Sequence, residues 1–199
     1  MKETTPTKKR FERPFAALNR DRWKTYLANP SGQVALLTPC GRATQKRFLR
    51  DIALVMDTLV SNMCLRTRKV GVIARNGFFL YTWEKIAKEC NLPLWRVKQC
   101  AARIIENGWL ESTQPRGLTI TNGKPAYVCL ASIKRITLKY ITAAGLKKAF
   151  TEAHAAAKKS VMKLSIRYNK PVKYLLTPIT LLAKFKRVKA AIPSPQPPN

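Results

Sequence analysis

Acidic residues are scarce in this 199-residue chain, which has 10 Asp and Glu against 38 Lys and Arg and a formal net charge of +28. A charge this far from zero concentrates polyanions around a protein. An ordinary neutral enzyme is therefore a poor expectation. Nucleic acid or an anionic membrane surface is the expected partner, and the hydrophobic content of 46% is enough to fill a core.

Long apolar runs are also missing. Lys or Arg interrupts every stretch before it approaches about 18 consecutive apolar residues, the length that spans a bilayer. Residues Met1 to Arg10 lead into no apolar signal core. We expect no membrane-spanning segment and a cytoplasmic protein.

Histidine occurs once, at His154, which excludes a zinc site with two imidazoles and the two-histidine metal cradle of rolling-circle nicking enzymes. The five cysteines lie 24, 26, 10 and 29 residues apart, a spacing that matches no zinc-ligand pair and leaves one thiol over in any disulfide scheme. Neither G-x-x-x-x-G-K-[ST] nor G-x-G-x-x-G is present. We expect free, mostly buried thiols, no catalytic residues, no metal and no cofactor.

The positive charge lies mainly towards the two ends. Residues 1–50 carry 12 basic and 3 acidic side chains, residues 51–111 carry 9 and 6, and residues 112–199 carry 17 and 1. Electrostatic adhesion is therefore expected mostly from the flanks. The predicted parts are a basic, partly disordered N-terminal extension over 1–40, a globular domain over 41–140, a basic amphipathic helical extension over 141–190 and a disordered proline-rich tail over 191–199.

The globular part begins with a helix and a hairpin. Apolar residues recur at three- and four-residue steps from Thr44 to Cys64, which predicts a helix with one core-facing side. The pair Asn76-Gly77 then joins the runs VGVIA and FFLY. Asn-Gly between β-rich runs is a strong hairpin signal because both residues tolerate positive φ.

Two further helices follow the hairpin. Thr82 is a suitable N-cap for a short helix that Asn91-Leu92-Pro93 ends, and a third helix runs from Leu94 to Asn107 and stops at Gly108. We expect wing strands over 109–113 and 126–131; the residues between them form the connection, where a further strand over 118–121 stays open. The predicted fold class is α+β, mainly helical: a winged helix-turn-helix with a basic helical C-terminal extension.

The third helix has DNA-reading residue types opposite its apolar face. At 100° per residue this side is centred near Gln99, and Arg96 and Arg103 flank it. Arg can bind guanine and Gln can bind adenine through two hydrogen bonds, whereas Lys98 is placed to touch phosphate. The predicted DNA contacts are Trp95, Arg96, Lys98, Gln99 and Arg103, with Arg116 and Lys124 on the wing and Lys158 and Lys159 in the basic extension.

The outward-facing residues of this helix also have simpler interpretations. Outward Arg, Lys and Gln on a helix are usually only solvated, and Trp95 could pack against the segment from Phe11 to Trp23. Winged helices also serve as protein-docking modules. The exposed tryptophan and the charge favour DNA.

The basic extension has a helical pattern from Thr142 to Leu164 with an apolar stripe along one side. That stripe could complete the core, pair with a second copy in a homodimer, or bind a partner, and core packing is the commonest outcome. Residues 170–189 suit a phosphate-contacting extension, and a membrane-surface helix over 175–188 is an alternative.

Three stretches together resemble the RepA replication initiators of IncFII-group plasmids. They are LYTWEKIAKECNLPLWRVKQCAARIIENGWLEST, KRITLKYITAAGL and AHAAAKKS, and the matching region covers more than half of the chain. The Ile-Thr-Leu strand exit followed by an Ala-rich helix with a basic doublet is the most specific part, whereas Asn91 stands where the family tends to have Gly. The resemblance implies a plasmid replication initiator that binds double-stranded origin DNA, acts in replication and copy control, and recruits the host initiator and the replicative helicase.

A winged-helix transcriptional regulator and an RNA-associated basic structural protein are the alternatives. An RNA-associated protein would be expected to have an aromatic stacking sheet. This chain lacks one, because Phe78 and Phe79 are adjacent and face opposite ways.

Overall fold

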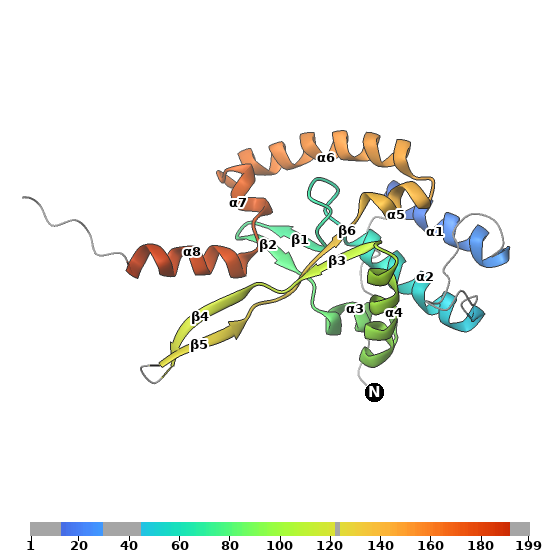
Figure 1. Ribbon diagram of the computed structural model, residues 1–199. Coiled ribbons are helices and arrows are strands. Elements are labelled where there is room, and N and C mark those ends of the chain that lie inside the picture. Colours follow the sequence, from blue (N-terminus) through green and yellow to red (C-terminus); the bar gives the residue numbers. More distant parts are fainter. Residues whose placement is uncertain (1–12, 30–44, 122–123, 192–199) are drawn as a thin grey trace, which may run out of the picture.

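The computed structural model describes residues 13–29, 45–121 and 124–191 and has an α+β, mainly helical fold, as predicted (Figure 1). Its β structure consists of three two-stranded antiparallel sheets, β1-β2, β3-β6 and β4-β5. The elements in chain order are α1 (Pro14–Ala28), α2 (Lys46–Ser61), β1 (Gly71–Ala74), β2 (Gly77–Leu80), α3 (Trp83–Cys90), α4 (Leu94–Glu106), β3 (Leu110–Thr113), β4 (Arg116–Thr121), β5 (Lys124–Cys129), β6 (Ile133–Ile136), α5 (Leu138–Ala143), α6 (Lys147–Tyr168), α7 (Val172–Leu176) and α8 (Ile179–Ala191).

Helix α2 is the centre of the main core, and α1, α3 and α4 all pack against it. Its inner side chains include Ile52, Val55 and Met56, none of which is accessible to solvent. The helix predicted from Thr44 to Cys64 is confirmed over Lys46–Ser61. Its apolar spacing brings three neighbouring helices onto one element.

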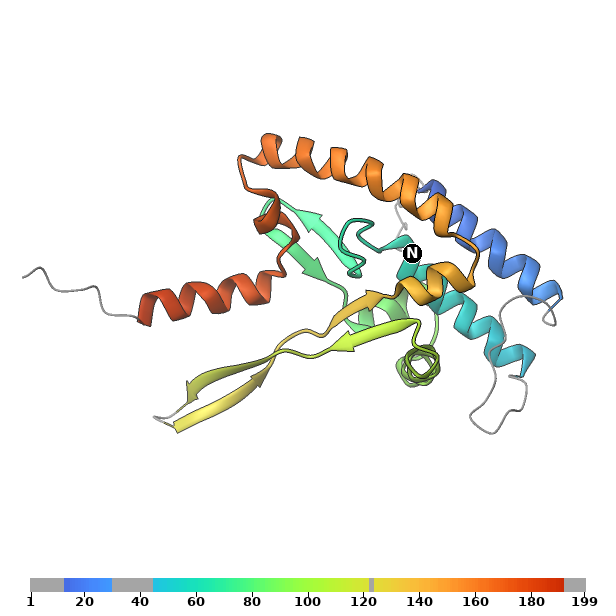
Figure 2. The ribbon, with the colours of Figure 1, turned by 45° about the horizontal axis from the view of Figure 1, so that its top comes forward.

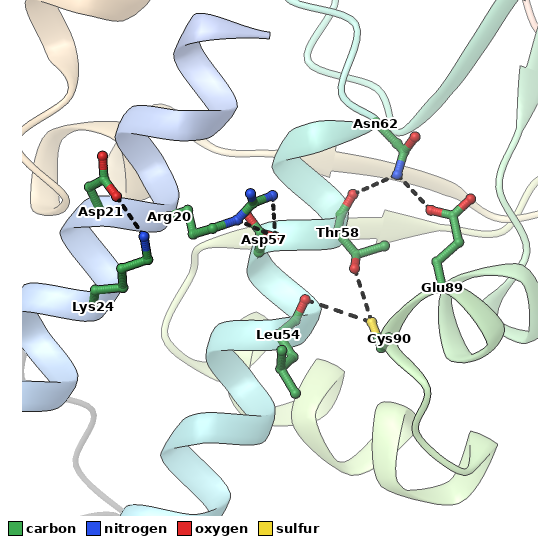
Figure 3. Close-up of polar contacts among 9 residues, drawn as sticks. All are labelled: Arg20, Asp21, Lys24, Leu54, Asp57, Thr58, Asn62, Glu89 and Cys90. Atoms are coloured by element: carbon green, nitrogen blue, oxygen red, sulfur yellow. Dashed lines mark hydrogen bonds and ion pairs between the residues drawn. The ribbon is translucent and has the colours of Figure 1, made fainter. Parts of the chain in front are cut away.

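Polar contacts reinforce this packing from both sides of α2 (Figure 3). Arg20 of α1 donates two hydrogen bonds to Asp57 Oδ2 at 3.1 and 3.0 Å. Asn62, just after α2, donates to Glu89 Oε2 of α3 at 2.8 Å, and the Cys90 thiol donates to Thr58 Oγ1 at 3.2 Å. These contacts fix the orientation of α3, and through it the start of α4.

Helix α1 lies within the segment that we expected to be an extension, and it packs into the main core. Trp23 contacts the Trp109 ring edge-on with centroids 6.2 Å apart. Its indole Nε1 donates to the Tyr140 hydroxyl at 2.9 Å, and that hydroxyl donates to Asn19 Oδ1. This buried chain of hydrogen bonds joins α1 to α5. The rest of the expected extension, residues 1–12 and 30–40, lies outside the described residues.

The predicted hairpin is present as β1 and β2, with Ile73 opposite Phe78. The sequence predicted the turn at Asn76-Gly77, which is one residue too far along the chain. Arg75 and Asn76 form it, and Gly77 already belongs to β2, where its φ of 116° suits glycine. Phe78 is fully buried and Phe79 is exposed, as the alternation of a strand requires.

Helices α3 and α4 begin and end where the sequence predicts. The Thr82 side chain accepts a hydrogen bond from the Lys85 backbone N–H, which caps α3. Asn91 ends α3 in the left-handed conformation with φ 52°, the role that glycine often fills. Gly108 follows α4 with φ 69°.

The predicted pairing of 109–113 with 126–131 is wrong. Strand β3 pairs with β6, so that Leu110 lies opposite Ile136, and the chain between them forms a separate hairpin of β4 and β5. The open question over 118–121 is thereby answered, because these residues belong to β4. The backbone N–H of Val70 also bonds to the Lys134 carbonyl at 2.9 Å, which lays the segment before β1 along β6.

Helix α6 runs along the side of the molecule away from α4, whereas α8 projects from the body (Figures 1 and 2). The helix predicted over 142–164 starts later, at Lys147, because Gly145 with φ 68° separates it from α5. Its apolar stripe packs on this chain: Phe150 meets Phe15 edge-on, and Val161 packs in a second core cluster with Phe78. Among the described residues, no helix combines the length and the apolar character needed to cross a bilayer.

We predict that Tyr140→Phe destabilises the fold. The change leaves the buried Trp23 Nε1–H without its acceptor and Asn19 Oδ1 without its donor. Each unsatisfied buried group costs about 1–3 kcal/mol, so the free energy of unfolding should fall by about 2 kcal/mol or more. Urea denaturation followed by circular dichroism measures it, and Tyr127→Phe at an exposed position is the matched control. Equal stability of the two variants would contradict the role given to the Tyr140 hydroxyl.

Candidate nucleic-acid interface

One side of α4 is packed and the other faces solvent. Val97, Cys100 and Ile104 are fully buried against the core. On the opposite side Trp95 is 66% exposed, and Lys98 and Gln99 are also exposed. The structure therefore brings three of the predicted contacts together on an open surface in the first two turns of α4. Trp95 is too exposed to be the packing residue of the simpler interpretation.

Arg96 belongs to the same helix but is held within the protein. Its Nε donates to Asp51 Oδ2 of α2 at 2.7 Å, and its guanidinium lies over the Phe48 ring, 4.6 Å from the centroid. Its Nη1 donates to Gln99 Oε1 at 2.7 Å. Arg96 thus fixes α4 to α2 and orients Gln99, a role that helical spacing alone does not reveal.

Arg103 is similarly enclosed. Its side chain is mostly buried and pairs with Glu106 at 3.5 Å. Both predicted arginines therefore have carboxylate partners within the chain, which leaves Trp95, Lys98 and Gln99 as the open part of this surface.

Lys134 of β6 is an anchor that the sequence reasoning missed. It is buried, its Nζ donates to the Tyr81 carbonyl and to Ser132 Oγ, both at 2.8 Å, and it lies 4.5 Å from the centre of the Trp83 ring. Desolvation by burial lowers the pKa of Lys134 to about 8, against the nearby negative charge of Glu84. Lys134 ties β6 to the start of α3. The only sequence signal for its inward position was its spacing of two residues from Ile136, because alternate residues of a strand face the same side.

The β4-β5 hairpin extends from the β3-β6 pair, on the same side of the molecule as α4 (Figures 1 and 2). Arg116 is exposed at the start of β4. Lys124 is the first residue of β5, and its side chain lies outside the described parts.

Lys158 and Lys159 are both exposed on α6. This helix runs along the side of the molecule opposite α4 in both views (Figures 1 and 2). The predicted contacts therefore fall on two surfaces, and a straight duplex lying on α4 would not reach the α6 lysines. Among the described residues, the predicted contacts on α4 and those on α6 therefore do not form one continuous surface.

Most carboxylates in the described residues are paired with cations of the same chain. The pairs are Asp21 with Lys24 at 3.1 Å, Asp51 with Arg96 at 2.7 Å, Asp57 with Arg20 at 3.0 Å, Glu89 with Lys85 at 3.3 Å, Glu106 with Arg103 at 3.5 Å and Glu111 with Arg135 at 3.9 Å. These pairs lie on α1 to α4 and the β3-β6 pair. Beyond Glu111 only Glu152 is acidic, so the hairpin, α7 and α8 carry cations without acids.

Nothing in the described residues gathers three or more His, Cys, Asp or Glu side chains into a metal site. The free thiols of Cys64, Cys90 and Cys100 are buried, and desolvation raises the pKa of Cys100 to about 12, which makes it a poor nucleophile. The chain matches no family model, no curated protein and no solved structure.

We predict that Lys134 makes stability depend on pH. Its pKa is about 8 in the folded chain against an ordinary 10.5, so between these values the unfolded chain holds a proton that the folded chain has released. The contribution of Lys134 to the free energy of unfolding therefore rises with pH above about 8 and is lowest below it.

The measurement is urea denaturation of the native chain and of Lys134→Met from pH 7 to 9.5. The raised pKa values of Cys90 and Cys100 act in the opposite direction in both proteins, so the difference between the two proteins is the informative quantity. That difference should grow in favour of the native chain as the pH rises. A constant difference would show that Lys134 keeps an ordinary pKa.

Proposed function

We propose that this chain binds double-stranded DNA as a winged helix-turn-helix protein, with α4 in the major groove and the β4-β5 hairpin beside it. The observation that carries the proposal is the order of the elements around α4. Helices α3 and α4 are joined by a short turn, α4 leads directly into β3, and β3 pairs with β6 at the base of a projecting hairpin. This is the order in which such proteins arrange a recognition helix and its wing.

The segment just before β1 supports this proposal. Arg68 accepts a backbone hydrogen bond from Ile136 at 3.0 Å, and Val70 donates to Lys134. Because β3 pairs with the other side of β6, β6 lies between β3 and the short segment that ends at Val70. A small sheet in this place braces the recognition helix of a winged-helix protein.

The first half of α4 supplies the groove contacts in this proposal. Gln99 accepts from Arg96 through Oε1, so its amide NH2 remains to donate to a purine N7 or O6 in the major groove. Lys98 is placed for phosphate, and the exposed Trp95 ring for sugar or a thymine methyl group. Glu106, at the far end of α4, would repel phosphate.

We further propose that the DNA is a plasmid replication origin and that the chain initiates replication without enzymatic activity of its own. The resemblance to the IncFII RepA initiators supports this, because two of its three stretches make up α3, α4, β6 and α5. Strand opening would then depend on recruited host proteins, the initiator and the replicative helicase. A transcriptional regulator uses the same α4 surface, and its targets would be promoters in place of an origin.

We predict sequence-specific duplex binding that α4 controls. Fragments tiling the DNA that encodes this chain and its flanks are titrated with protein at several salt concentrations, with random duplex as competitor. One fragment should be retained at high salt. Gln99→Ala should lower its preference over random duplex by about tenfold, since one good base contact discriminates by about 1–3 kcal/mol.

The matched control is the double variant Lys158→Ala/Lys159→Ala on α6, which should weaken every duplex alike and leave the preference unchanged. Arg96→Ala is unsuitable as a test, because it also breaks the contact with Asp51. Equal loss of preference in the α4 and α6 variants, or uniform binding that disappears steeply with salt, would contradict the proposed function.

A further inference from the structure

We propose that the base of the β4-β5 hairpin and helix α8 form a site for single-stranded nucleic acid. This site goes beyond the duplex contact of α4, because it uses other residues and other chemistry. Proteins that hold single strands combine a cationic surface along the backbone with exposed aromatic rings on which bases stack. Both ingredients occur here on two adjacent projecting elements.

Helix α8 and the hairpin leave the body of the molecule on the same side in both views (Figures 1 and 2). A direct contact joins them near their bases: Lys184 Nζ of α8 donates to the Arg116 carbonyl of β4 at 3.2 Å. The start of α8 is also fixed to the body, since Ile179 and Leu182 lie against Gly77 of β2. The two elements therefore have a defined relation where they meet.

Each element carries an aromatic ring that faces solvent. Tyr127 of β5 is 75% exposed and Phe185 of α8 is 60% exposed. Both lie outside the two hydrophobic clusters. Large apolar side chains are costly to leave in water. Exposed rings on two neighbouring elements therefore indicate a ligand that covers them.

The strand register places Tyr127 close to the contact between the elements. Arg116 lies opposite Cys129, and Tyr127 comes two residues before Cys129 in β5, opposite Leu118. Two residues of a strand advance about 7 Å and return to the same face, which puts Tyr127 on the face of Arg116. Phe185 directly follows Lys184 in α8.

The charges around the two rings fit a phosphate backbone. Arg116, Lys184 and Lys186 are all exposed. From residue 112 to the end, the chain has one acidic residue, Glu152, which lies on α6. Neither the β4-β5 hairpin nor α8 contains an acidic residue, so phosphates meet cations on both elements and the rings meet the bases. An anionic membrane would meet the same charges, and the vesicle measurement below distinguishes it from a single strand.

The test uses the full chain and fluorescence anisotropy. The labelled probes are 20-mers of thymidine, of uridine and of abasic deoxyribose phosphate, which has the charge without the bases. The native chain should bind the thymidine probe at least about fivefold more tightly than the abasic one, and Tyr127→Ala and Phe185→Ala should each weaken thymidine binding by at least about fivefold. The substitutions Tyr127→Trp and Phe185→Trp should retain it. Met162→Ala/Ile166→Ala, which removes two exposed apolar residues from α6, is the matched control.

Equal affinity for the thymidine and abasic probes would overturn the proposal, because charge alone would then explain the binding. Loss of binding to phosphatidylserine vesicles in Phe185→Ala, with thymidine binding intact, would overturn it in favour of a membrane surface. Tighter binding of uridine or of thymidine supports the site and identifies RNA or DNA as its ligand. The ring variants should keep the duplex preference that Gln99→Ala lowers. Failure of duplex specificity with intact base-dependent binding would reject the proposed function and leave this site standing.

Discussion

Burial of α2 among α1, α3 and α4 is the interaction on which the remaining structure depends. The fully buried Ile52, Val55 and Met56 give one helix three neighbours, and the Arg20–Asp57 and Asn62–Glu89 contacts then fix the angles of two of them. Because α4 packs most extensively against α2, the direction of its exposed side follows largely from how α2 is packed. The surface proposed to read DNA is thus a consequence of core packing.

The few carboxylates are placed where the fold needs them. Asp51, Asp57 and Glu89 each join one helix of the α1 to α4 unit to another or stabilise one, and Glu111 lies opposite Arg135 in the β3-β6 pair. Most carboxylates of this unit therefore have a cationic partner within it. Acidic residues are scarce on α6, α8 and the hairpin, and the cations of these elements can meet polyanions without straining the core.

The sequence predicts the helices well and the roles of single charged residues poorly, for a physical reason. Helices α2, α3 and α4 have strong periodicity and good caps, such as Thr82, and local signals of this kind act within a few residues. Arg96 and Lys134 have the same residue types as solvated neighbours, and only distant partners, Asp51 and the Tyr81 carbonyl, decide that they face inward. The pairing of β3 with β6 is likewise non-local. Pro115 and the residues around Ser132 divide what would be one long hairpin into two short sheets. The alternation of residues alone therefore predicted the partner of β3 at 126–131, whereas the observed partner is β6.

The division of the molecule into two cationic sides limits how it can use nucleic acid. The α4 surface and the hairpin share one side, whereas the lysines of α6 lie on the other. A single straight duplex can engage only one side at a time, so α6 either adds long-range attraction or meets a second segment. The hairpin lies between α4 and α8, with Arg116 in contact with Lys184. If a duplex lies on α4 and a single strand on the base of the hairpin, as proposed, the hairpin marks the point where paired and unpaired DNA separate. An initiator without an ATP-binding loop could then hold an opening that its partners produce.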